Sequence, residues 1–84
     1  MGMVGLTLHV MPESAEVGIH HLKESIQKVQ HVRQVSEEPI GFGLVMLDVL
    51  LVFDDKVGAG DAEDRIKAIP GVGSVESGDV TLIS

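Results

Sequence analysis

The architecture of this chain follows from residues 39–53, which read PIGFGLVMLDVLLVF. The second part, Leu44 to Phe53, is apolar at almost every position, which predicts a central β-strand that is covered on at least one side. The first part places Phe42 between Gly41 and Gly43 at the start of that strand. Glycine removes the Cβ groups that would crowd the ring and permits a positive φ, so Phe42 either projects outward or folds back onto the core.

The segments before this strand predict two more strands and one helix. Apolar and polar residues alternate from Val4 to Val10, which indicates a half-buried strand, and a connection with Pro12 follows. A helix begins after Gly18, because apolar residues then recur at intervals of three and four. Val32 to Val35 suits a second strand, which enters a turn at residues 37–39. The apolar stripe of the helix consists of Ile19, Leu22, Ile26 and Val29.

The segments after the central strand predict one helix and one strand. Acidic residues that suit a helix N-terminus begin at Asp61, and Pro70 ends that helix. Val72 to Val75 and Val80 to Ile83 indicate a last strand that is broken near Gly78. The order βαββαβ predicts an α+β fold, a ferredoxin-like sandwich in which a four-stranded antiparallel sheet carries two helices on one face.

Length and composition narrow the possible functions. The 84 residues suit a single domain over residues 1–84. A net charge of −7 and an aromatic content of 2% disfavour direct nucleic-acid binding, since that requires basic residues and stacking platforms. The chain has no cysteine, no secretory signal and no apolar run long enough to cross a membrane. We therefore expect a soluble, cytoplasmic protein.

Candidate catalytic and metal-binding residues do not form a known pattern. The acidic residues after the central strand lack the spacing of an EF-hand loop, and adjacent histidines on a helix point about 100° apart. Serines lack a nucleophile elbow, and no glycine-rich loop carries a P-loop lysine. We expect no metal site, no cofactor and no covalent catalysis, with Asp48 on the solvent face of the sheet. The residues considered are Asp54, Asp55, Asp61, Glu63, Asp64, His9, His20, His21 and His31.

Three short blocks carry a resemblance to a known family. They are HVMPES at residues 9–14, PIGFGL at residues 39–44 and VFDDKV at residues 52–57. Their order and spacing cover most of the chain. On these blocks the chain resembles the archaeal translation elongation factor 1-beta family and the catalytic domain of its eukaryotic counterpart.

This resemblance implies a function without covalent chemistry. Members of the family are guanine nucleotide exchange factors that bind the GTPase elongation factor 1-alpha in its GDP form and speed GDP release. In the eukaryotic relatives the phenylalanine that matches Phe42 enters a pocket on the GTPase, which implies a partner-binding site of Phe42 with Ile40, Gly41 and Gly43. A C-terminal lysine acts beside that phenylalanine in the relatives, whereas no basic residue follows Lys67 here.

Two alternatives stay open on the sequence. One is a ligand-binding or regulatory ferredoxin-like module, similar to an ACT domain, and the other is a non-catalytic subunit of a translation assembly, held by an exposed sheet face. The state of Phe42 distinguishes them, because an exchange factor needs the ring accessible at a loop tip and a ligand-binding module buries it. The sequence does not give the oligomeric state.

Overall fold

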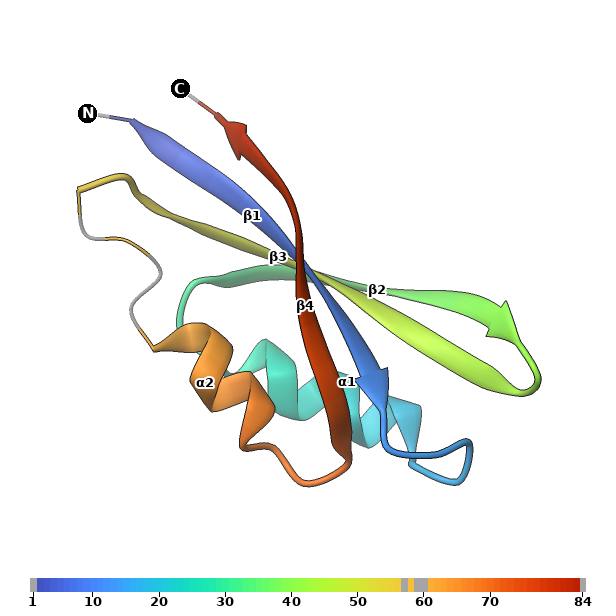
Figure 1. Cartoon of the computed structure of the whole chain (residues 1–84). Coiled ribbons are helices and arrows are strands. Elements are labelled where there is room, and N and C mark those ends of the chain that lie inside the picture. The colour runs from blue at the N-terminus through green and yellow to red at the C-terminus, as the bar shows by residue number, and fades with distance from the viewer. Residues whose placement is uncertain (1, 57, 59–60, 84) are drawn as a thin grey trace.

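The computed structural model describes residues 2–56, 58 and 61–83. Within this part of the chain four strands form one antiparallel sheet in the order β2-β3-β1-β4, and two helices cover one face of it (Figure 1). This arrangement confirms the predicted ferredoxin-like α+β fold. The elements are β1 (Met3–Pro12), α1 (Ile19–Gln27), β2 (Val32–Gly41), β3 (Leu44–Asp54), α2 (Ala62–Lys67) and β4 (Val72–Leu82).

The hydrophobic core lies between the two helices and the central strands β1 and β3. Strand residues that alternate along the chain face the helices, as in the cross-strand pairs Leu8–Val49 and Val10–Leu47. The helices contribute one buried stripe each, with Leu22 and Ile26 on α1 and Ile66 on α2. The side chains that are fully buried are Leu8, Val10, Ile26, Leu47, Val49, Leu51 and Ile66, each 0% exposed.

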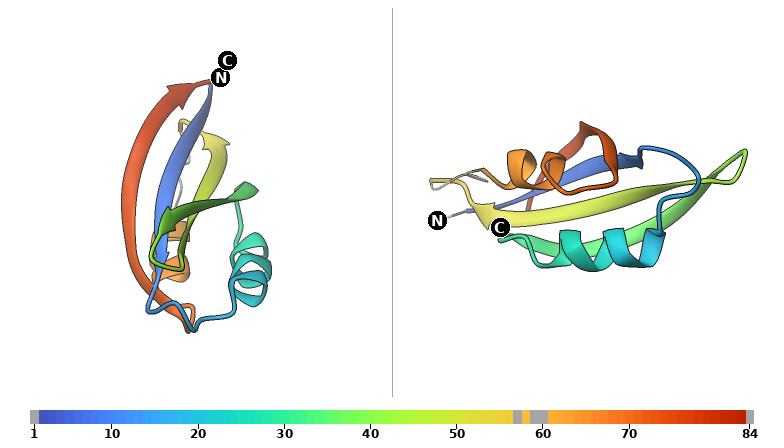
Figure 2. Two further views of the ribbon diagram at one scale, coloured as in Figure 1. Left: turned by 90° about the vertical axis from the view of Figure 1, so that its right-hand side faces the viewer. Right: turned by 90° about the horizontal axis from the view of Figure 1, so that it is seen from below.

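Strand β2 is longer than the sequence predicted. The expected turn at residues 37–39 is wrong, since Glu37 pairs with Leu47 and Pro39 pairs with Val45 in the β2–β3 ladder. Proline is compatible with this position because β2 is an edge strand, where one side of the backbone needs no donor. The register slips by one residue between Pro39 and Gly41, which makes Ile40 the extra residue of a β-bulge. The hairpin therefore extends beyond both helices (Figure 2).

Strand β4 runs through Gly78 without the predicted break. The register changes there, because Leu6 pairs with Val80 whereas Leu8 pairs with Ser77, which is a second bulge. A Cβ at position 78 would lie 2.6 Å from Nε2 of His9. Glycine is thus needed for the close approach of β4 to the His9 ring rather than for a chain break.

The open face of the sheet carries a cross-strand hydrogen bond between two polar side chains. His9 and Asp48 are register partners on β1 and β3, and Nδ1 of His9 donates to Oδ1 of Asp48 at 2.7 Å. Both side chains are about one-third exposed, which confirms that Asp48 faces solvent. Of the other histidines, His20 and His21 are exposed, whereas His31 is half-buried.

Neither helix of the described residues has the length and apolar character needed to cross a lipid bilayer.

We expect Leu47→Ala to lower the free energy of unfolding by about 2–5 kcal/mol, because the deletion leaves a cavity in the core. Urea unfolding followed by circular dichroism measures the change. Leu82→Ala is the matched control, since the same chemical change at a side chain that is 76% exposed costs less than about 0.5 kcal/mol. Equal losses for the two variants would contradict this description of the core.

Candidate functional site

A two-residue loop joins β2 to β3. Gly41 pairs with Leu44, so only Phe42 and Gly43 lie between the strands, and we call these two residues the hairpin tip. The φ angle is +54° at Phe42 and +75° at Gly43. Positive φ at both central residues is typical of a type I′ turn, whose twist matches the right-handed twist of the strands beside it.

The glycines on both sides of Phe42 have left-handed backbones. Gly41 has a φ of +103° at the bulge, and Gly43 occupies the second turn position. A Cβ at position 41 would meet no atom within 4 Å, so the requirement for glycine at this position is conformational and not steric. Three successive positive φ angles thus fix the direction in which the chain leaves β2 and enters β3.

The ring of Phe42 faces solvent. The residue is 100% exposed, and Ile40 at the bulge is 45% exposed. By contrast Phe53, the other aromatic residue of the chain, is packed against the core, with its ring centroid 6.3 Å from that of His31. Of the two conformations that the sequence allows for Phe42, the outward one is therefore present.

The conformation of Phe42 is unfavourable for the isolated domain in two ways. A left-handed backbone costs a non-glycine residue about 1–2 kcal/mol, and a fully exposed ring gains nothing from burial. Residues whose conformation is unfavourable and is not compensated by contacts within the domain are typically those that act on another molecule. The geometry therefore makes the hairpin tip the leading candidate for a protein-binding site.

Two contacts support the base of the hairpin. Ala15 in the β1–α1 loop has its Cβ 4.0 Å from the Cβ position of Gly43. Nζ of Lys23 on α1 lies 3.6 Å from Oε2 of Glu37 on β2. The loop and the first helix thus lie against the hairpin below the tip, while Phe42 itself extends past them.

The C-terminal end of β4 lies at the opposite end of the sheet. Leu82 and Phe53 both pair with Val4, so β4 ends where β1 begins and β3 ends (Figure 1). The length of β3 separates this end from the hairpin tip by roughly 30 Å, at about 3.3 Å per residue. The end of β4 therefore lies far from Phe42.

Sequence reasoning missed a second set of exposed apolar side chains at this C-terminal end. These residues of β4 and its extension are 67%, 76% and 52% exposed. The signal in the sequence was the largely apolar stretch at residues 80–83. The residues are Val80, Leu82 and Ile83.

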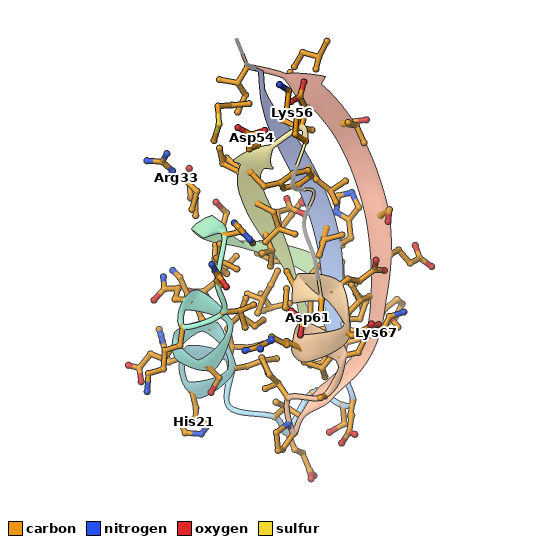
Figure 3. All side chains as sticks on the ribbon, turned by 90° about the vertical axis from the view of Figure 1, so that its left-hand side faces the viewer. His21, Arg33, Asp54, Lys56, Asp61 and Lys67 are labelled. Carbon is orange, nitrogen blue, oxygen red and sulfur yellow. The ribbon has the colours of Figure 1, made fainter. Side chains whose placement is uncertain are left out.

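The acidic residues of α2 are explained by pairing along the helix. Nε of Arg65 lies 2.9 Å from Oδ2 of Asp61, and Nζ of Lys67 lies 3.7 Å from Oε1 of Glu63. The hydrogen bond from Arg65 holds the pKa of the Asp61 carboxyl below its usual value. Figure 3 shows Asp61 and Lys67 at the two ends of α2, whereas Asp54 and Lys56 lie at the end of β3. Acidic residues 54 and 61 therefore do not form one cluster.

Other kinds of site are not found in the part of the chain that the structure describes. No group of three or more histidine, aspartate or glutamate side chains there is placed to hold a metal ion. Residues 2–56, 58 and 61–83 also enclose no cavity of ligand size. Among these residues, Phe42 at the hairpin tip is the most exposed of the large apolar side chains.

The fold and the tip define a small α+β domain that presents one aromatic side chain on a β-hairpin. The EF-1 guanine nucleotide exchange domain matches residues 5–84 of the chain. The chain belongs to this family, and its function is guanine nucleotide exchange in translation elongation. This result confirms the resemblance carried by residues 9–14, 39–44 and 52–57.

Individual relatives match over their whole length. Elongation factor 1-beta of Methanosphaerula palustris is 44% identical, over 98% of this chain and 99% of that protein. The proteins of the same name from Methanoculleus marisnigri and Methanosphaera stadtmanae are 43% and 42% identical. Their alignments cover 99% and 95% of this chain, and 100% and 96% of those proteins.

We expect Phe42→Asn to raise the free energy of unfolding by about 1 kcal/mol, because asparagine tolerates a positive φ and Asn-Gly favours the type I′ turn. Phe42→Val is the control, since a β-branched residue disfavours this backbone and lowers stability. Both changes are measured by urea unfolding. A loss of stability in the asparagine variant would show that the ring contributes to folding and is not simply presented to a partner.

Proposed function

We propose that the chain binds elongation factor 1-alpha in its GDP form and accelerates GDP release by placing Phe42 in an apolar pocket of that GTPase. The observation that carries this proposal is the complete exposure of Phe42 on a two-residue turn. Ile40, which is 45% exposed at the bulge, is a smaller apolar contact, and Gly41 and Gly43 supply the backbone that directs the ring outward. We place this activity in the cytoplasm, without direct contact to nucleic acid.

The mechanism is thermodynamic linkage. An exchange factor binds the nucleotide-free GTPase more tightly than the loaded one, so it must weaken GDP binding by the same factor. The chain makes and breaks no covalent bond and acts as a ligand that shifts an equilibrium. A coupling free energy of about 1–3 kcal/mol corresponds to a change of roughly 5–150-fold in affinity.

Phe42 has the properties of an interface hot spot. A phenylalanine buries about 150–250 Å² when it enters a pocket, which provides the largest apolar contribution that one side chain of this domain can make. The short turn restricts the backbone before binding, so little conformational entropy is lost on docking. Hot-spot residues of this kind lose about 2 kcal/mol or more of binding free energy when truncated.

The alternatives that the sequence left open are less well supported. A ligand-binding module similar to an ACT domain requires Phe42 to be buried, and the ring is 100% exposed. A subunit held by its open sheet face requires an apolar surface, and the centre of that face carries the hydrogen-bonded polar side chains of His9 and Asp48. Both observations favour the hairpin tip as the binding element.

We expect Phe42→Asn to reduce the acceleration of GDP release by about 30-fold or more, which corresponds to about 2 kcal/mol. The measurement is the release rate of a fluorescent GDP from elongation factor 1-alpha of a methanogenic archaeon at equal concentrations of wild type and variant. Phe42→Tyr retains the ring and most of the activity. Gln27→Ala, an exposed change at the far end of α1, leaves the rate unchanged.

Two results would count against the proposal. Absence of acceleration by the wild-type chain would remove the exchange function as we describe it. Full activity of Phe42→Asn would show that the chain is an exchange factor whose binding site is not the hairpin tip.

A further inference from the structure

Exposed carboxylates lie on two segments near the hairpin tip, namely the β1–α1 loop and β2. Glu13 and Glu16 belong to the β1–α1 loop, whose Ala15 lies 4.0 Å from the Cβ position of Gly43. Glu38 lies on β2, where it pairs with Met46 close to the start of the hairpin loop. All three side chains belong to exposed residues. We call Glu13, Glu16 and Glu38 the acidic rim.

The acidic rim is not neutralised by the ion pairs of the described residues. Three of the basic side chains are paired with other carboxylates: Lys23 with Glu37 at the base of the hairpin, Arg65 with Asp61 and Lys67 with Glu63. The other three lie toward the opposite end of the sheet: Lys28 caps the C-terminus of α1, and Arg33 and Lys56 lie where β2 begins and β3 ends (Figure 3). The end of the molecule that carries Phe42 is thus strongly acidic.

Charge at the edge of an apolar anchor has a defined role in protein association. Charged groups are depleted from the centre of interfaces and retained at the rim, where they stay hydrated. Rim charges change the association rate and its salt dependence more than they change the dissociation rate. Mutual repulsion of three like charges is unfavourable in the free chain, and an oppositely charged surface on the partner relieves it.

We propose that the pocket that receives Phe42 is bordered by lysine or arginine side chains, and that the acidic rim steers the chain onto it. This inference rests on the proposed function and adds the chemistry of the partner surface: an apolar pocket with a basic border. The positive charge of this border complements the three carboxylates of the acidic rim, which two separate segments of the chain place near the hairpin tip.

The experiment compares two variants with the same net charge. Glu13→Gln, Glu16→Gln and Glu38→Gln together neutralise the rim, and Asp55→Asn, Asp64→Asn and Asp79→Asn together neutralise three exposed acids away from the tip. Each triple variant changes the net charge from −7 to −4, since three negative charges are removed. Stopped-flow fluorescence with elongation factor 1-alpha loaded with fluorescent GDP gives association and dissociation rates at low and high salt.

We expect the rim variant to associate about tenfold more slowly at low salt, with an unchanged dissociation rate and a flatter salt dependence. The control variant associates at nearly the wild-type rate, and the difference between the two disappears at about 1 M salt, where the Debye length is about 3 Å. Phe42→Asn, in contrast, dissociates faster.

Equal slowing in the two triple variants would overturn the proposal, because net charge alone would then explain the effect. Association of the wild-type chain that does not depend on salt would overturn it as well. Either result together with a strong effect of Phe42→Asn would leave the proposed function in place. Loss of the Phe42 effect would count against the proposed function itself.

Discussion

The two-residue connection between β2 and β3 is the constraint on which the rest of the structure depends. Gly41 must pair with Leu44, so Phe42 and Gly43 have to reverse the chain with positive φ at both positions. This reversal sets the register of β3, and β3 in turn places Val49 and Leu47 opposite the core residues of β1. The same turn leaves the Phe42 ring without a neighbour inside the domain, so folding and exposure have one cause.

The residues that stabilise the domain and the residue proposed to bind the partner lie in different parts of the molecule. The core that stabilises the domain lies between the helices and the middle of the sheet, whereas Phe42 lies beyond both helices and is fully exposed. A left-handed phenylalanine is locally unfavourable, and in the proposed function that cost is offset by docking on the GTPase. The folded core thus fixes the position of one exposed side chain, Phe42, and acidic residues lie near that side chain.

The sequence predicted the fold well where side-chain periodicity reports burial. The alternation in β1 and the helical stripe with Leu22 and Ile26 correspond to buried positions, and alternate residues of the apolar run in β3 are buried. The sequence-based prediction of a turn at residues 37–39 and of a break near Gly78 was wrong, because backbone pairing overrides the local preference of these residues. Pro39 lies within an edge strand, and Gly78 accommodates a bulge. The residues of the tip were identified by resemblance and local glycines, but their full exposure depends on the register of the hairpin. The separation of the tip from the end of β4 depends on tertiary structure, which no local pattern contains.

The most direct test of the account uses the absence of tryptophan and tyrosine from the chain. A single tryptophan at position 42, introduced by Phe42→Trp, reports the environment of the tip alone. The account predicts solvent-exposed emission in the free chain, a blue shift when nucleotide-free elongation factor 1-alpha is added, and reversal of that shift by excess GDP. The control Gln27→Trp shows no shift. Unchanged emission at position 42 in a variant that still accelerates GDP release would contradict the central claim that the hairpin tip enters the partner.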